Sequence, residues 1–230
     1  MTFLCIALGK EVDQAIKEGN KALLGTLKEL SLKKRNRLQF LNYVCIGRMT
    51  ENIDLAKEWA VCRPDETNGW VHKYELDMEG LKVLDFQKYS ILSWLAELMK
   101  HRDAADSKRY RMLSQKFIAK YGIETSGYDV IKGWRADASY FYIAKAFVRD
   151  EIDVEILEEL LLLGGLEIQY CIKSELAYSR LSERKEELIS VEYDEFNEKY
   201  NERDVTARKR MKELIDSDAN KVTNVFSTLL

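Results

Sequence analysis

A chain of 230 residues, 46% of them apolar, can bury the core of one large domain without disulfides or metals to stabilise it. Its 36 Lys and Arg nearly balance its 39 Asp and Glu, for a net charge of −3, so it lacks the basic excess that general nucleic-acid binding requires. No apolar run approaches the ~20 residues that span a bilayer, and the short apolar start lacks the cationic flank of a signal peptide. We therefore expect a cytoplasmic protein that binds neither membranes nor nucleic acid in general.

Cysteine and histidine spacing gives no sign of disulfides or of a metal site. His72 and His101 lie far apart and have no Cys, Asp or Glu at the spacing of known zinc signatures, so no metal site is expected. The cysteines show no paired spacing and are expected to be free thiols in a reducing compartment. They are Cys5, Cys45, Cys62 and Cys171.

The first predicted element is a helix. Apolar residues at alternating spacings of three and four predict an amphipathic helix over residues 10–31, whose apolar stripe would pack on the domain or on a partner protein. Aliphatic and aromatic residues predict a strand over 38–46, and a helix over 51–62 follows Thr50. Residues 70–76 alternate as a half-buried strand does, and a four-residue loop would return the chain into a second strand as a hairpin.

The second half of the chain is predicted to contain more helix. Ser174 is expected to cap a short helix, and the strongly charged residues 183–218 predict exposed helices that pack through one narrow stripe. The other predicted elements are helices over 90–102, 107–120, 137–149 and 153–163, with strands over 128–131 and 167–173.

The order of these elements predicts the fold class. Strands and helices do not alternate regularly, which favours an α+β fold of small mixed sheets wrapped by helices, not a doubly wound parallel sheet. We expect a helical N-terminal segment over 1–37, a domain over 38–182, and a charged helical extension of that domain over 183–230.

Residues 133–141 (GWRADASYF) contain the most informative candidate site. Arg135 could clamp a phosphate or carboxylate, and Asp137 could cap a helix and accept a hydrogen bond from a ribose hydroxyl. In the alternative interpretation, Asp137 is simply an N-cap and the aromatic residues are core. The basic stretch 100–120 is likewise either a solvated helix face or an anion-binding patch.

Three segments resemble a bacterial family of uncharacterised proteins within the ADP-ribosyltransferase-like superfamily. Residues 133–141 are similar to its G-[YW]-R-A-D-D-S-Y-F segment, 163–174 (LGGLEIQYCIKS) to its L-G-x-L-G-E-Q-[FVY]-V-L-K-S segment, and 50–60 (TENIDLAKEWA) to its helix after the second strand. The resemblance runs from about Thr50 to the C-terminal helices. It implies two small sheets that hold NAD in a cleft between them.

The chain departs from this family at the positions that carry catalysis. Members usually begin with an L-Y-H-G-S strand, whose His grips the nicotinamide ribose, whereas the first 31 residues here look helical. The stacking Tyr of the G-F-Y-x-T motif is replaced by Arg48, and the Glu of the E-Q pair, which stabilises the ribosyl cation, by Ile168. The second Asp of R-A-D-D is Ala138. Each lost charge-stabilising group typically lowers the rate ~10²–10³-fold.

The resemblance thus implies a catalytically degenerate protein that acts by binding or regulation, with NAD as ligand if the cleft is retained. Its ligand-binding residues would be Arg135, Asp137, Tyr140 and Gln169. One alternative is an active, toxin- or defence-type NAD-dependent transferase in which a bulge brings Glu167 to the ribosyl cation, Arg135 holds the pyrophosphate and Tyr140 stacks. Another is a protein that binds a partner through its N-terminal helix, with a vestigial cleft.

Overall fold

The computed structural model describes residues 2–8, 48–61, 68–101, 108–134, 138–163, 168–183, 189–218 and 225–230. The predicted helix over 10–31 and the predicted strand over 38–46 lie outside these ranges, so partner binding through that helix stays a prediction. No helix in the described ranges is both long and apolar enough to cross a membrane.

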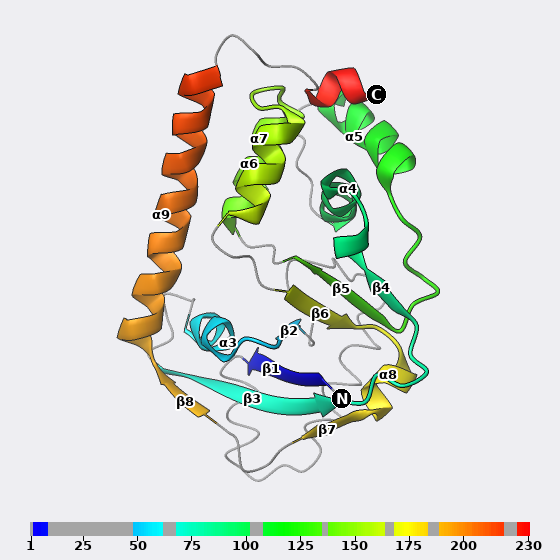
Figure 1. Ribbon diagram of the computed structural model, residues 1–230, viewed down its shortest axis with the longest axis vertical. Helices are drawn as coiled ribbons and strands as arrows, with labels where there is room; N and C mark the ends of the chain where they lie inside the picture. Colours follow the sequence, from blue (N-terminus) through cyan, green and yellow to red (C-terminus); the bar gives the residue numbers. More distant parts are fainter. Residues whose placement is uncertain are drawn as a thin grey trace.

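The described strands form one mixed sheet in the order β4-β5-β6-β2-β1-β3-β7, and β8 also pairs with β3 (Figure 1). β4 and β5 are parallel, and the other pairs are antiparallel. The strands are β1 (Thr2–Leu8), β2 (Arg48–Thr50), β3 (Asn68–Leu76), β4 (Val83–Asp85), β5 (Val130–Trp134), β6 (Ile168–Ile172), β7 (Leu181–Glu183) and β8 (Ile189–Glu192).

The sheet has two halves that meet at β2. This short strand pairs with β6 at three positions, but with β1 at one, Cys5 with Thr50. Tyr74 and Leu76 of β3 pack in one apolar cluster with Val130 of β5 and Ile172 of β6, which belong to the other half. The sheet therefore folds back on itself, and Figure 1 shows β5 and β6 lying over β1 and β3.

Helices cover the outer face of the β4–β5–β6 half. Its core joins Leu84 and Ile131 of the strands to Trp94, Phe117 and Phe147 of three helices. The helices are α4 (Ile91–His101), α5 (Lys108–Tyr121), α6 (Ala138–Val148) and α7 (Val154–Leu162), with the 3-10 turns η2 (Phe86–Lys88) and η3 (Phe226–Leu229). The 26-residue helix α9 (Tyr193–Asp218) runs along the side of α6 and α7 (Figure 1).

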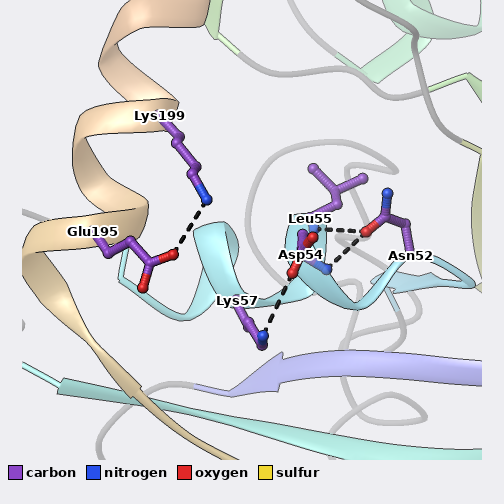
Figure 2. A network of polar contacts seen from close by, with 6 residues as sticks. All are labelled: Asn52, Asp54, Leu55, Lys57, Glu195 and Lys199. Atoms are coloured by element: carbon purple, nitrogen blue, oxygen red, sulfur yellow. Dashed lines mark hydrogen bonds and ion pairs between the residues drawn. The ribbon is translucent and has the colours of Figure 1, made fainter.

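The short helix α3 (Ile53–Ala60) is attached to the end of β2. The side chain of Asn52 caps it, accepting hydrogen bonds from the backbone N–H of Asp54 at 2.7 Å and of Leu55 at 3.1 Å (Figure 2). Lys57 of α3 and Lys199 of α9 both lie against the ring of Phe196, at 5.1 and 4.6 Å from its centroid. α9 therefore holds α3, and α3 fixes where β2 ends.

Most elements predicted from the second helix onward are confirmed, as is the α+β class. Ser174 caps α8 (Glu175–Ser179), with its hydroxyl 3.0 Å from the backbone nitrogen of Ala177. The sequence pattern also identified α3, β3, α4, α5, β5, α6, α7 and β6 near their observed bounds.

The prediction that residues 1–37 are helical is wrong at its beginning. Thr2–Leu8 is β1, which lies between β2 and β3 and pairs with β3 along its whole length. A strand inside a sheet is a nearly continuous apolar run, and seven such residues show no period that separates strand from helix.

Two further predictions need correction. β3 and β4 do not form a hairpin, because β1 occupies one edge of β3 while β7 and β8 occupy the other, so β4 pairs instead with β5. Residues 183–218 are not helical throughout, since β8 precedes α9 and pairs with β3 from Asn68 to Val71.

Asp129 ties together the chain before β4 and the end of β6. Its carboxylate accepts a hydrogen bond from the backbone N–H of Lys82 at 2.8 Å, and its carbonyl accepts one from the N–H of Lys173 at 2.8 Å. A hydrogen bond from Ser174, followed by the Lys82 N–H, holds the pKa of the carboxyl below its ordinary value, because both favour the charged form.

We expect Asp129→Asn to lower the free energy of unfolding by about 1 kcal/mol near pH 7, because a charge-assisted hydrogen bond is weakened. A lowered folded-state pKa stabilises the protein above the unfolded value, and this stabilisation is lost as pH falls through the folded value. Urea unfolding at several pH values should therefore show the two proteins converging below about pH 4. A difference that stays constant with pH would contradict this role.

Candidate functional site

Three segments that are distant in the sequence meet in one row across neighbouring strands. Thr50 of β2 is the register partner of Gln169 of β6, and Gln169 is the register partner of Gly133 of β5. Thr50 is 1% exposed and its hydroxyl accepts a hydrogen bond from the backbone N–H of Asn52 at 3.2 Å. Paired residues of antiparallel strands direct their side chains to the same face, so the three positions form one surface.

Gly133 lets the indole ring of Trp94 lie directly on this row. A Cβ atom at position 133 would come within 2.9 Å of that ring, a distance that real Cβ atoms essentially never show. Trp94 is 3% exposed and also packs edge-on against Phe86 and Trp134, so the ring is held in place. Glycine at 133 is thus required for α4 to approach β5.

Gln169 carries an unusual buried group. The residue is 9% exposed, and its amide Nε2 has no hydrogen-bond partner among the residues that the structure describes. Leaving a buried donor unsatisfied costs about 1–3 kcal/mol, so such a group in a folded protein needs an explanation. A ligand that accepts a hydrogen bond from this amide would supply one.

A second row lies on the opposite face of the same strands. Asp85 of β4, Lys132 of β5 and Tyr170 of β6 are successive register partners. Lys132 Nζ lies 3.9 Å from Asp85 Oδ2 and 5.6 Å from the centre of the Tyr170 ring. The Tyr170 hydroxyl donates a short hydrogen bond to Glu51 Oε1. Burial first, and then the Glu51 carboxylate, raises the pKa of Tyr170 far above its ordinary value, so the phenol keeps its proton.

The structure describes only part of the predicted site. Gln169 lies in β6 and is buried, and Tyr140 lies in the first turn of α6, where the backbone alone is described. Arg135, Asp137 and Glu167 lie outside the described residues. Trp134 and Ile168 are register partners, so the described chain stops in β5 and resumes in β6 at the same end of two neighbouring strands.

The altered positions behave differently from one another. Ile168 packs against the apolar cluster between the two halves of the sheet, so no charged group stands at that position on β6. Arg48 pairs through its backbone with Cys171. The strand that appeared to be missing is present as β1, but its residues, TFLCIAL, contain neither His nor Arg.

Other candidate groups have structural surroundings. His72 is buried in β3 opposite Ile6, and Cys171 is a free thiol. Within the described residues, no group of three or more His, Cys, Asp and Glu side chains could hold a metal ion. In the basic stretch, Lys100 pairs with Glu97 at 2.9 Å, while the charged side chains of α5 are exposed to solvent.

Sequence reasoning missed the Glu51, Tyr170, Lys132 and Asp85 group. Each is an unremarkable polar residue in its own segment, and only the register of four strands brings them together. One signal was available, since charged residues at the inner positions of strands as short as β4 and β5 are unusual unless they are paired.

We expect Gly133→Ala to destabilise the protein by about 1–3 kcal/mol, because the new methyl group overlaps the Trp94 ring and either α4 or β5 must move. Thermal or urea unfolding would measure this. Gly127→Ala is the matched control, since a Cβ atom there meets nothing within 4 Å. Equal effects of the two substitutions would show that Trp94 does not constrain the row.

Comparison with known proteins assigns the chain to a family. Residues 48–182, more than half of the chain, match the model of a family described as "Protein of unknown function (DUF3990)". The match begins at β2 and includes both rows, whereas β1 and α9 lie outside it. No curated protein and no solved structure matches the chain. The chain belongs to the DUF3990 family.

Proposed function

We propose that this member of the DUF3990 family is an ADP-ribosyltransferase-like protein that binds an NAD-type ligand beside the row of Thr50, Gln169 and Gly133. In this proposal the protein acts by binding, as a regulator or partner protein, and does not turn the ligand over. The observation that carries it is the buried Gln169 amide, which has no partner among the described residues and is located where three motif segments converge.

The three converging segments are the ones that carry the sequence resemblance. Thr50 belongs to the segment similar to the family's second motif, Gly133 begins the G-W-R-A-D segment, and Gln169 is the Gln of the E-Q pair. Residues that share one row across adjacent strands can contact one ligand together. The division of the sheet into two halves at β2 is also consistent with a superfamily that holds NAD between two small sheets.

Turnover would require charges that the described strands do not supply. Breaking the nicotinamide–ribose bond builds positive charge on the ribose, which a fixed negative group must stabilise. Ile168 is apolar and packed in a core cluster, and β1 offers no cationic or imidazole group to orient the ribose. The altered groups together leave little of the ~10²–10³-fold rate gain that each typically gives.

An active transferase that uses Glu167 would need a bulge to bring this residue into the site. β6 pairs with β5 at five consecutive positions, from Ile168 to Ile172, without an extra residue. The described strand therefore gives this alternative no support.

We expect calorimetry to detect binding of NAD⁺, and Gln169→Met to weaken it about 3–10-fold, because one hydrogen bond to the ligand is lost. The same substitution should raise the free energy of unfolding of the unliganded protein, since it removes an unsatisfied buried group without changing the side-chain length much.

Ser114→Ala is the matched control for Gln169→Met. Its hydroxyl is also buried without a partner among the described residues, but it lies on α5. It should stabilise the protein and leave NAD⁺ affinity unchanged. If neither variant changes binding, Gln169 is not a ligand contact.

We further expect the purified protein to hydrolyse NAD⁺ no faster than buffer and to transfer no ADP-ribose to lysate proteins. Labelled NAD⁺ would detect either reaction. Transfer that disappears in Glu167→Gln but survives in Glu175→Gln would establish the enzyme interpretation instead.

A further inference from the structure

We infer that the carboxylate of Glu51, held by the hydroxyl of Tyr170, is the fixed negative charge of this site and selects a ligand with a positive charge, such as an oxidised nicotinamide ring. This inference rests on the proposed function. It concerns a residue at the end of β2 that neither the motif resemblance nor the family description assigns.

The strand register places Glu51 next to the position where the acid is missing. β2 and β6 pair as Arg48 with Cys171, Met49 with Tyr170 and Thr50 with Gln169. The next residue along β2 is Glu51, and the preceding residue of β6 is Ile168. Glu51 therefore stands across from Ile168 at the ends of two paired strands, where side chains lie about 5 Å apart on one face. A carboxylate absent from one strand is supplied by its neighbour.

Tyr170 fixes the position of this carboxylate. The tyrosine is 4% exposed and packs in the apolar cluster between the two halves of the sheet, so its ring cannot turn away. Its hydroxyl donates to Glu51 Oε1, and its raised pKa keeps the donating proton on the phenol. The capped helix α3 begins two residues after Glu51, which fixes the backbone as well. A charge held in place needs no reorganisation when a ligand arrives.

The surrounding charges leave Glu51 able to act on a ligand. The nearest positive charge in the row, Lys132, lies 3.9 Å from Asp85 and is balanced by it. In the described part of the chain, no basic side chain forms an ion pair with Glu51. Glu51 is also exposed, whereas Asp85 and Lys132 have side chains only 17% and 28% exposed. A cation arriving from solvent would reach Glu51 first.

The test compares two ligands that differ mainly in charge. NAD⁺ carries a positive nicotinamide ring and NADH a neutral one, with the same two ribose and phosphate groups. We expect the wild-type protein to bind NAD⁺ at least about tenfold more tightly than NADH, a difference within reach of one charge pair near a protein surface. Isothermal calorimetry of both ligands measures the ratio.

Glu51→Gln should abolish this preference by weakening NAD⁺ alone, since the neutral amide keeps the size of the side chain but not its charge. Tyr170→Phe should reduce the preference only in part, because the carboxylate remains but is no longer oriented. Glu198→Gln, on the exposed face of α9, is the control and should keep the wild-type ratio. Thermal unfolding of each variant shows whether it is folded.

The outcomes separate the role of Glu51 from the proposed function. Wild-type protein that binds neither ligand overturns the proposed function. Wild-type protein that binds NAD⁺, together with a folded Glu51→Gln variant that keeps the full preference, leaves the proposed function in place and overturns the role of Glu51. A preference that disappears only in Glu51→Gln and declines in Tyr170→Phe supports both.

Discussion

The described structure depends on the backbone pairing of a three-residue strand. β2 joins β6 at three positions and β1 at one, and no other described strand connects the two halves of the sheet. Three pairs are few for a central strand, because the mean strand is about five or six residues long. The helix attached to β2 compensates for this shortness. Asn52 caps α3, and α3 packs between the sheet and α9, so the end of β2 is fixed from outside the sheet.

This constraint also determines what the two faces of the sheet can contain. Neighbouring residues of a strand point to opposite faces, so Gln169 and Tyr170 serve different surroundings although they are adjacent in the sequence. Gln169 lies in the row with Gly133, on the side where Trp94 and the helices pack. Tyr170 lies on the side where the two halves of the sheet face each other. A shift of one residue in the register of β2 would exchange these surroundings and separate Thr50 from Gln169.

The sequence predicted this fold unevenly, and the reason is physical. Elements with a clear period were predictable, as with α3, where Leu55, Ala56 and Ala60 are buried on one face. β1 was not, because a buried central strand has no alternation to read. The supposed hairpin of β3 failed because its partner depends on which edges are already occupied, and no local pattern encodes that. For the site, motif resemblance found Thr50, Gly133 and Gln169, but their adjacency is a property of the register.

Electrostatic function belongs to a position in space and not to a position in the sequence. Reading β6 alone, the replacement of an acid by Ile168 looks like the loss of a charge. Reading β2 and β6 as a pair, a carboxylate remains within the reach of one strand spacing, and Tyr170 of β6 donates to it. The two residues stabilise each other's state, since the carboxylate keeps the phenol protonated and the phenol orients the carboxylate. Motif comparison treats each segment separately, so it records the change at Ile168 and cannot register what the neighbouring strand contributes.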